Sequence, residues 1–468
     1  MRGKKRGISV VVGGFVAALA IVAAGCGGGD DSSTLKIVSD LPLQGGNLVQ
    51  TEQMIAAIEY VLEQADYKAG DYDIEYESFD DAIASTGNWD EATCASNART
   101  YADDDSIVGI IGTYNSGCAG IIIPIVNEAS LAMISPANTA VGLTHEGPGS
   151  NPGEPDKFYP TGERTYVRVV ASDDFQGGVG AQYMKDELGV TKVFILDDKE
   201  QYGKGVTDSF EIAANEIGLE VAGHEGWDKD APNYTALMTK IKATGADGIY
   251  IGGVVPNNGG QLIKDKVSVL GDNEQVKVIV TDGFVTTDTF TVAGEETAEG
   301  IYGTAPTRPA DQLTEAGQQF AAGFQATLGE DEPLQVYTLY AAAATQALLD
   351  AIARSDGSRA DIVTQLFATD VETAVGQMSF NADGDPAGGT QQLFRAESGA
   401  WVWQHRPGWL FLARFIAYKI FNAGVREQGC VKVHGFFSFP VLFPHEHQEG
   451  YDHLRPAAQV QLPIHAIL

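Results

Sequence analysis

The sequence predicts an α/β protein of two lobes, each built on a doubly wound parallel sheet and joined by a hinge. Short β-branched runs alternate with helical segments from residue 34 onward, an order that calls for a parallel sheet between two layers of helices. The alternation stops and starts again after Tyr166. The chain has 468 residues, of which 44% are hydrophobic and 20% charged. This length and composition fit a globular protein of two or three domains.

The first half of the body shows four strand patterns and three helix patterns. Apolar residues at helical spacing, such as Met54, Ile58, Val61 and Leu62, define the first helix. Pro124 is expected in the first turn of the third helix, where a proline is tolerated. The predicted strands are 35–39, 72–79, 107–111 and 131–134, and the predicted helices are 54–65, 89–101 and 121–129.

The second half repeats the alternation and ends differently. A long Ala-rich helix is predicted over 334–353, a late strand over 375–380, and a turn at Asp383-Gly384-Asp385. The other predicted strands are 193–196, 248–251 and 276–280, separated by helices around 178–188, 203–217, 233–243 and 258–269.

Several polar residues follow directly after the predicted strands. Small ligands of such sheets bind beyond the carboxyl ends of the strands, at the switch point of each lobe. Hydroxyls and backbone N–H groups there suit a carboxylate, while Asp282 suits an ammonium group. For each residue alone, turn hydrogen bonding or helix capping is the alternative. The candidates are Ser116, Ala137 and Thr139 in the first lobe and Asp198, Tyr202 and Asp282 in the second.

The N-terminus has the order of an export signal. A basic segment, Met1–Arg6, precedes the apolar run Ile8–Ala20, which is too short to span a bilayer. The sequence Ala23-Ala24-Gly25-Cys26 resembles the bacterial lipobox, in which the cysteine is lipidated and becomes the new N-terminus. We therefore expect a signal peptide over 1–26, a lipid anchor at Cys26 and a flexible tether over 27–33. A cleaved, unlipidated signal is the alternative.

Export places the remaining cysteines in an oxidising compartment, where disulfides persist. Cys94 and Cys118 lie in one half of the body, which favours a bridge between them over two free buried thiols. No cysteine or histidine spacing suggests a metal site, and His445-Glu446-His447 does not continue into the His-Glu-x-x-His pattern.

Charge and missing motifs narrow the functional classes. A net charge of −33 argues against binding nucleic acid, because a phosphate backbone is held by clustered Lys and Arg. There is no Gly-x-Ser-x-Gly elbow, no phosphate loop, and no Gly-x-Gly-x-x-Gly after a strand. We therefore expect a protein that is not an enzyme and needs no cofactor. An extracellular α/β enzyme remains the alternative from another class.

Residues 34–403 resemble the Leu/Ile/Val-binding family of extracytoplasmic receptors for ABC importers, which have the type I periplasmic-binding fold. The resemblance rests on motifs in sequence order: Pro42-Leu43, Ile110-Ile111-Gly112, Ile134-Ser135-Pro136-Ala137-Asn138-Thr139, Asp198-Lys199-Glu200-Gln201-Tyr202-Gly203, Gly252-Gly253, Ala298-Glu299-Gly300, Phe380-Asn381-Ala382-Asp383-Gly384-Asp385 and Trp401-Val402-Trp403. It implies three crossovers, placed near Tyr166, Thr304 and Thr373. Lobe 1 would then hold 34–166 and 305–373, and lobe 2 would hold 167–304 and 374–403.

The resemblance also implies ligand-binding roles. Ser116, Ala137 and Thr139 would hold the carboxylate of an amino acid, the last two also helping with its ammonium, and Tyr202 and Asp282 would complete the site. Val254 and Gln50 stand where relatives often have aromatic residues that line the side-chain pocket, so the ligand's side chain is left open. Some members also have a disulfide that Cys94 and Cys118 fit loosely.

The resemblance thus implies a monomeric, lipid-anchored receptor on the outer face of the cell membrane. It would capture an amino acid, a branched-chain one among the candidates, and deliver it to an ABC transporter permease. A receptor for an amide, a urea-like compound or another polar solute is the alternative.

The composition changes abruptly at Gln404. Six of the eight histidines follow it, together with Cys430 and the aromatic cluster Phe436-Phe437-Ser438-Phe439. The resemblance ends here as well. We interpret 404–468 as the product of a shifted reading frame or of gene joining, with a functional appendix as the alternative.

Overall fold

The computed structural model describes residues 34–329 and 332–404. The predicted signal peptide, the Cys26 anchor, the tether, and the tail from 405 onward with Cys430 lie outside the described residues. Among the described residues, no helix combines the length and the apolar character needed to cross a membrane.

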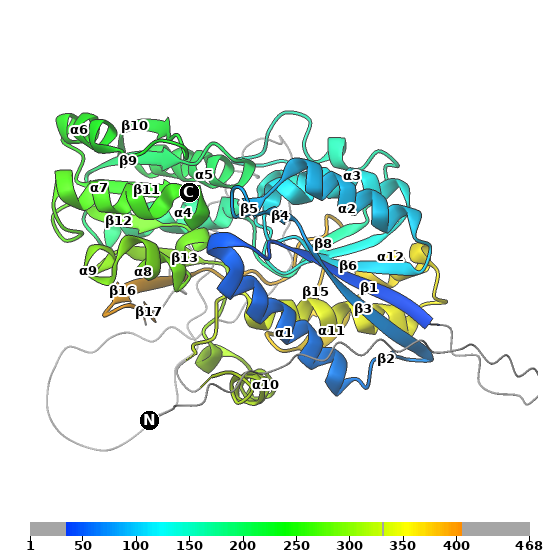
Figure 1. Ribbon diagram of the computed structural model, residues 1–468. Coiled ribbons are helices and arrows are strands. Elements are labelled where there is room, and N and C mark those ends of the chain that lie inside the picture. The colour runs from blue at the N-terminus through cyan, green and yellow to red at the C-terminus, as the bar shows by residue number, and fades with distance from the viewer. Residues whose placement is uncertain (1–33, 330–331, 405–468) are drawn as a thin grey trace, which may run out of the picture. The chain divides into compact units, whose positions relative to one another are not determined.

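The first lobe is built on a six-stranded sheet, here called sheet A, with the strand order β2-β3-β1-β6-β7-β8 (Figure 1). All neighbours pair in parallel except β2, which is antiparallel to β3. The chain runs from β1 to β3 on one side and then to β6 on the other, so the switch point lies between β1 and β6. The strands are β1 (Thr34–Leu41), β2 (Lys68–Ala69), β3 (Tyr72–Asp80), β6 (Ile107–Gly112), β7 (Ala132–Ser135) and β8 (Tyr166–Arg168), and a two-stranded ribbon of β4 (Ala82–Ile83) and β5 (Asn88–Trp89) lies outside this sheet.

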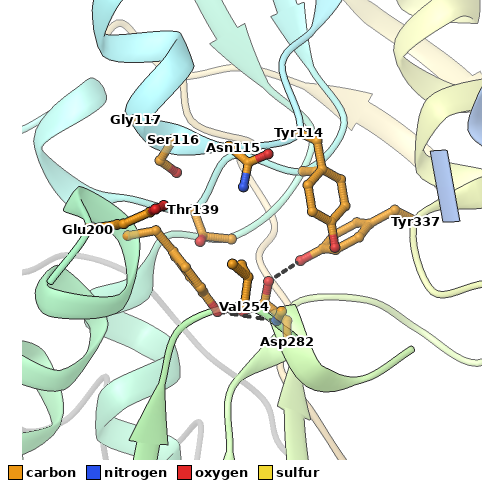
Figure 2. Close-up of a pocket in the computed structure, with 12 residues that line it drawn as sticks. Tyr114, Asn115, Ser116, Gly117, Thr139, Glu200, Val254, Asp282 and Tyr337 are labelled. Carbon is orange, nitrogen blue, oxygen red and sulfur yellow. Dashed lines mark hydrogen bonds between the residues drawn. The ribbon is translucent and has the colours of Figure 1, made fainter. Parts of the chain in front are cut away.

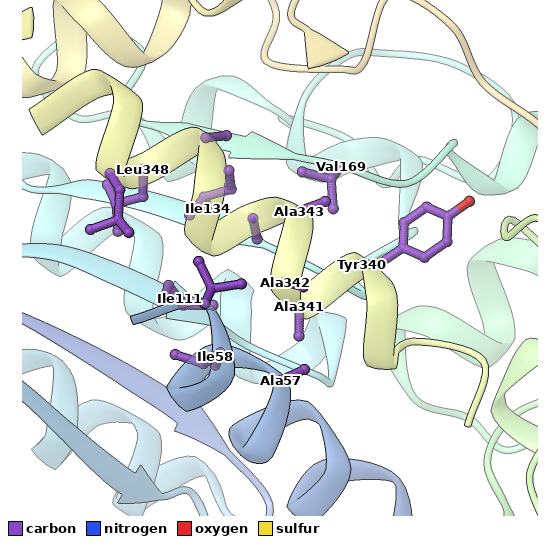
Figure 3. Close-up of a cluster of buried hydrophobic side chains, with 14 of the residues drawn as sticks. Ala57, Ile58, Ile111, Ile134, Val169, Tyr340, Ala341, Ala342, Ala343 and Leu348 are labelled. Atoms are coloured by element: carbon purple, nitrogen blue, oxygen red, sulfur yellow. The ribbon is translucent and has the colours of Figure 1, made fainter. Parts of the chain in front are cut away.

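Alternate residues of sheet A pack into two helical layers. Ile37, Ile111 and Ile134 belong to one core cluster, whereas the adjacent residues Val38 and Ile110 belong to the other, as the period of two in a strand requires. Figure 3 shows the first cluster, where the small side chains of Ala341–Ala343 let α11 lie close to the sheet. This layer holds α1 (Leu48–Gln64), α10 (Glu315–Gln325), α11 (Thr338–Arg354) and α12 (Arg359–Phe367), and the other holds α2 (Glu91–Asp103) and α3 (Ser116–Glu128).

The second lobe is built on a seven-stranded sheet, sheet B, with the strand order β10-β9-β11-β12-β13-β16-β17 (Figure 1). The first five strands are parallel, and β16 and β17 extend the sheet in antiparallel fashion. The switch point lies between β9 and β11. The strands are β9 (Lys192–Asp197), β10 (Glu220–Gly226), β11 (Gly248–Gly252), β12 (Lys277–Val280), β13 (Tyr302–Ala305), β16 (Gln392–Glu397) and β17 (Ala400–Trp403).

Sheet B also separates two helical layers. Phe194 and Ile249 pack into one core cluster, while Ile195 and Tyr250 pack into the other. Each lobe is thus a sheet between two layers of helices, as the sequence predicts. One layer holds α4 (Asp173–Asp186) and α5 (Gln201–Ile217), and the other holds α6 (Thr235–Thr244), α7 (Gly260–Leu270), α8 (Asp288–Ala293) and α9 (Glu295–Ala298).

The third crossover differs from the sequence prediction. The hairpin of β14 (Asp370–Thr373) and β15 (Gly376–Ser379) follows α12, and its Val375 and Met378 lie in the same core cluster as α11. Residues 374–379 therefore pack with lobe 1, although the sequence assigned them to lobe 2, and the crossover follows the hairpin. Apolar residues in a short hairpin do not reveal from the sequence which core they enter.

An ionic cluster joins the first and third crossovers. Arg168, at the end of β8, is fully buried, and its Nε lies 2.7 Å from Asp385 Oδ1. His145 Nδ1 lies 2.9 Å from Asp385 Oδ2, and its Nε2 lies 3.8 Å from Asp174 on α4. The predicted turn at Asp383-Gly384-Asp385 thus supplies Asp385, whose carboxylate holds two of the connections between the lobes together.

The start of α3 also differs from the prediction. The helix begins at Ser116, five residues before the predicted start, so Pro124 lies inside it rather than in its first turn. Ser116, Gly117 and Cys118 form the first turn of this helix. The predicted disulfide is present, joining Cys94 of α2 to Cys118 of α3.

Candidate functional site

A pocket lies between the lobes, beyond the carboxyl ends of both sheets (Figure 2). Its cavity volume is about 20 Å³, which is room for about one water molecule. An amino acid therefore enters only if the lobes separate or the lining side chains turn. The lining residues are Tyr114, Asn115, Ser116, Gly117, Ala137, Thr139, Glu200, Tyr202, Val254, Asp282, Gly283 and Tyr337.

Lobe 1 supplies hydroxyl groups and the start of a helix. Ser116 is the first residue of α3, where backbone N–H groups and the helix dipole favour an anion. Its hydroxyl accepts a hydrogen bond of 3.3 Å from the backbone N–H of Ala140, which ties it to the loop after β7. Thr139 lies in that loop, is 1% exposed, and its Oγ1 has no hydrogen-bond partner. This wall can receive a carboxylate.

Lobe 2 supplies Asp282, which follows β12. The Tyr202 hydroxyl donates to Asp282 Oδ1 at 2.5 Å, and Gln176 Nε2 donates to the same oxygen at 2.7 Å. From lobe 1, the Tyr337 hydroxyl donates to Asp282 Oδ2 at 2.6 Å. Figure 2 shows this last bond reaching Asp282 across the pocket.

Burial raises the pKa of Asp282, and the hydrogen bonds from Tyr202, Tyr337 and Gln176 oppose that effect. A second buried carboxyl group, Asp173 at the start of α4, has no hydrogen-bond partner, and burial together with the charge of Asp282 raises its pKa well above its usual range. The Thr139 hydroxyl lies close enough to lower the pKa of Asp173, but not in hydrogen-bonding geometry. A cation near these two acids would relieve their mutual repulsion.

Asp198 holds the loop that carries Val254. Its Oδ2 accepts from the Val254 backbone N–H at 3.2 Å and from Asn257 Nδ2 at 2.9 Å. Gly253 has φ of +155°, and a Cβ there would lie 2.6 Å from Asp198 Oδ2. Only glycine fits this close approach, which explains the Gly-Gly turn after β11. Asp198 is therefore a positioning residue and does not line the pocket.

Two further hydrogen bonds connect the lobes beside the pocket. Trp89 Nε1 of lobe 1 donates to Glu200 Oε2 of lobe 2 at 3.0 Å. Asn88 Nδ2 donates to Asn257 Oδ1 at 3.0 Å, and both side chains are buried. Together with the Tyr337–Asp282 bond, these contacts stabilise the closed arrangement of the lobes.

Metal-binding side chains gather elsewhere in the described part of the chain. Asp81 lies near Cys94 and Cys118, whose sulfurs are already in the disulfide. Asp208, Glu211 and His224 form the other group, in which His224 Nδ1 lies 2.7 Å from Glu211. Neither group lines the pocket.

Residues 34–400 match the model of a family described as periplasmic binding protein. The chain belongs to the periplasmic binding protein family. Membership indicates an extracytoplasmic location, and it fits a pocket of binding groups set between two lobes.

Individual members of the family are similar over most of the described residues. A Leu/Ile/Val-binding protein homolog of Brucella abortus is 29% identical over 379 residues, covering 80% of this chain and 93% of the relative. A leucine-binding protein of Thermotoga maritima is 21% identical, covers 79% of this chain and 98% of its own, and has a TM-score of 0.67. The branched-chain amino acid transporter substrate-binding protein of Streptococcus pneumoniae, solved with isoleucine, is 20% identical, covers 80% and 100%, and has a TM-score of 0.66. These two structures confirm the predicted type I fold.

Of the seven residues to which the resemblance assigns ligand-binding roles, six line the pocket of this family member: Ser116, Ala137, Thr139, Tyr202, Val254 and Asp282. The seventh, Gln50, is a buried residue of α1 outside that lining, and both polar atoms of its amide lack a hydrogen-bond partner. Their part in ligand binding stays a prediction.

Sequence reasoning missed other lining residues, chiefly Tyr114, Asn115, Glu200 and Tyr337. Tyr114 and Asn115 follow the predicted strand 107–111, and Glu200 lies in the segment after the predicted strand 193–196. Their position beyond the carboxyl end of a strand could therefore have identified them as candidates. Tyr337 was hidden in the predicted helix 334–353, because its tyrosine and apolar neighbours continue the helical pattern. The observed α11 begins after it, at Thr338.

Proposed function

We propose that this protein is a solute receptor that closes its two lobes around an amino acid and delivers it to an ABC importer. The observation that carries the proposal is that the two facing walls of the pocket have groups of complementary chemistry. Hydroxyl groups and the start of α3 lie on lobe 1, and the buried carboxylate of Asp282 lies on lobe 2. An α-amino acid has the matching groups, a carboxylate and an ammonium a few ångströms apart.

Each wall suits one end of such a ligand. Ser116 and Thr139 would hydrogen-bond the carboxylate, helped by N–H groups in the first turn of α3. Asp282 would take the ammonium, with Tyr202 and Gln176 keeping its carboxylate in place. A ligand that contacts both walls binds the closed arrangement more tightly than the open one and so stabilises it. The closed arrangement is what a permease would recognise.

The names of the relatives point the same way. The Brucella abortus relative is named for leucine, isoleucine and valine, and the Streptococcus pneumoniae structure contains isoleucine. These relatives are binding proteins, so we propose that the present chain, too, is a receptor and not an enzyme. We also propose that it acts as a monomer anchored to the outer face of the membrane through Cys26.

A neutral amide or urea-like solute is the second candidate. It is favoured by the hydrogen bonds that Asp282 already accepts from Tyr202, Gln176 and Tyr337, since a carboxylate so engaged has less need of a cation.

The deciding experiment is native mass spectrometry of the exported protein, which identifies any ligand carried through purification, followed by calorimetry with the twenty common amino acids. Binding of an amino acid in the micromolar range or tighter is the expected result. Binding of neutral amides with no response to any amino acid would replace the proposal by the second candidate.

A further inference from the structure

Two neighbouring side chains of the pocket lack hydrogen-bond partners. Tyr114 and Asn115 are each 6% exposed, and the Tyr114 hydroxyl and Asn115 Oδ1 are buried without a partner. Both come from the loop between β6 and α3, and Figure 2 shows them beside the pocket, between Ser116 and Tyr337.

The state of Asn115 is unusual for its position. It is the N-cap residue of α3, but its side chain makes no capping hydrogen bond. Asparagine at an N-cap normally accepts a hydrogen bond from one of the first N–H groups of the helix. Here the carboxamide is available to a group in the pocket instead.

Buried polar groups almost always have a hydrogen-bond partner. Two adjacent exceptions that line a binding pocket therefore indicate partners supplied by the ligand. A hydroxyl and a carboxamide both donate and accept hydrogen bonds, so they match a ligand group that can do the same.

The arrangement places Tyr114 at the ligand's side-chain end, with Asn115 between Tyr114 and Ser116. Figure 2 shows Ser116 and Glu200 on one side of the pocket and Tyr114 and Tyr337 on the other, with Asp282 on the facing wall, where it accepts the hydrogen bond from Tyr337. An amino acid with its carboxylate at Ser116 and its ammonium at Asp282 would extend its side chain toward Tyr114.

The remaining lining residues disfavour charged side chains. Val254 and Ala137 are the only aliphatic residues of the lining, and much of the other apolar surface comes from tyrosine rings, each of which carries a hydroxyl. The lining contains no Lys, Arg or His, and an acidic side chain would be repelled by Asp282 and Glu200. Glu200 lies toward Ser116 and accepts a hydrogen bond from Trp89, so it is not placed to pair with a basic side chain at Tyr114.

We propose that the ligand is an amino acid with an uncharged polar side chain, a hydroxyl or a carboxamide, and that Tyr114 and Asn115 recognise that group. The proposal rests on the proposed function and specifies its substrate class. It differs from the aliphatic ligands in the names of the relatives because these two polar groups would be left unpaired beside an aliphatic side chain, and sites built to hydrogen-bond a ligand discriminate strongly against analogues that lack the group.

Calorimetry with amino acids of matched shape tests the proposal directly. Threonine and valine differ by a hydroxyl in place of a methyl group, and asparagine and leucine have nearly the same shape. We expect the polar member of at least one pair to bind the wild-type protein ten or more times more tightly. Asp282 and Ser116 contact groups common to both members, so the ratio isolates the side-chain end.

Two variants test whether Tyr114 and Asn115 cause the preference for a polar side chain. Tyr114→Phe and Asn115→Ala should each reduce the polar-to-apolar affinity ratio at least fivefold, while leaving affinity for the apolar member unchanged or higher. Tyr250→Phe is the matched control, because the Tyr250 hydroxyl is also buried without a partner but lies on β11 outside the pocket lining. Its ratio should equal that of the wild type.

The outcomes separate this proposal from the one on which it rests. If valine and leucine bind as tightly as their polar partners, or if acidic or basic amino acids bind best, the substrate class is wrong while the receptor function stands. If both variants keep the wild-type ratio, Tyr114 and Asn115 do not read the side chain. If no amino acid binds, the proposed function itself fails. The wild-type measurements decide the substrate class even if a variant does not fold.

Discussion

The Tyr337 hydroxyl of lobe 1 donates a hydrogen bond of 2.6 Å to Asp282 Oδ2 of lobe 2. The bond joins the lobes directly through the carboxylate that would bind an ammonium. Both side chains are buried, and Tyr202 and Gln176 hold the other oxygen of the same carboxylate. Tyr337 therefore stabilises closure of the pocket and also occupies an acceptor that the ligand would use.

Asp282→Ala should weaken amino-acid binding at least a hundredfold, a change of roughly 3 kcal/mol. The reason is that a buried ammonium left without its partner is strongly disfavoured. Ser116→Ala and Thr139→Ala should each weaken binding by about 1–2 kcal/mol, because neighbouring N–H groups still reach the carboxylate. Calorimetry measures all three, with Asp272→Asn, outside the pocket lining, as the control. Unchanged affinity in Asp282→Ala would show that no ammonium binds there.

Tyr337→Phe should open the lobes in the absence of ligand. A hydrogen bond to a charged group contributes about 1.5–3 kcal/mol, so its loss should raise the ratio of open to closed molecules by roughly tenfold or more. Single-molecule energy transfer between dyes on the two lobes reports this ratio. The ring of Tyr337 and its edge-to-face contact with Tyr114 are retained in the variant. An unchanged ratio would mean that the bond does not control closure.

The ionic cluster of Arg168, Asp385, His145 and Asp174 predicts that the stability of the fold depends on pH. Burial disfavours the charged form of His145, but the carboxylates of Asp174 and Asp385 outweigh it and raise the pKa of His145 to about 9. Because this value lies above the unfolded value of about 6.5, the protonated imidazole stabilises the fold fully below pH 6.5. That contribution is lost as the pH rises through 9.

The melting temperature of His145→Gln should therefore lie below that of the wild type at pH 6.5, and the gap should shrink between pH 6.5 and 9.5. Scanning calorimetry at several pH values measures it. Comparing the two proteins at each pH cancels the titration of other groups. A gap that does not vary with pH would contradict the assigned pKa of His145.

The Cys94–Cys118 bridge closes a loop with a sequence separation of 24. Such a loop contributes on the order of 3 kcal/mol through the unfolded state. Replacing both cysteines by serine should lower the free energy of unfolding by about that amount, as measured by urea denaturation. Labelling of the exported, unreduced protein should find neither thiol free. Modification of both residues before reduction would refute the bridge.

Cys26 is predicted to carry the lipid anchor. The wild-type protein should partition into the detergent phase, and Cys26→Ser should release it into the aqueous phase or leave its signal uncleaved. Fractionation followed by mass spectrometry of the N-terminal peptide distinguishes these cases. Wild-type protein found entirely in the medium would rule out the anchor.

Patterns along the chain, with the family resemblance, were sufficient to predict the alternating strands and helices, the two lobes and half of the residues that line the pocket. Strand periodicity and turn residues are local properties, and the carboxyl ends of parallel strands converge on one edge wherever such a sheet forms. Ser116, Thr139 and Asp282 could be singled out for this reason, and the pairing of Cys94 with Cys118 needed only their number and compartment.

Long-range packing decided the rest. Tyr337 reaches Asp282, 55 residues away in the sequence, only because a crossover returns the chain to lobe 1. Nothing in its local pattern separates it from the helix that follows. The Tyr114 hydroxyl and Asn115 Oδ1 are buried without partners, and Val375 and Met378 of the hairpin enter the same core cluster as α11. Such contacts join segments far apart in sequence, and the free energy of packing them is a property of the whole fold.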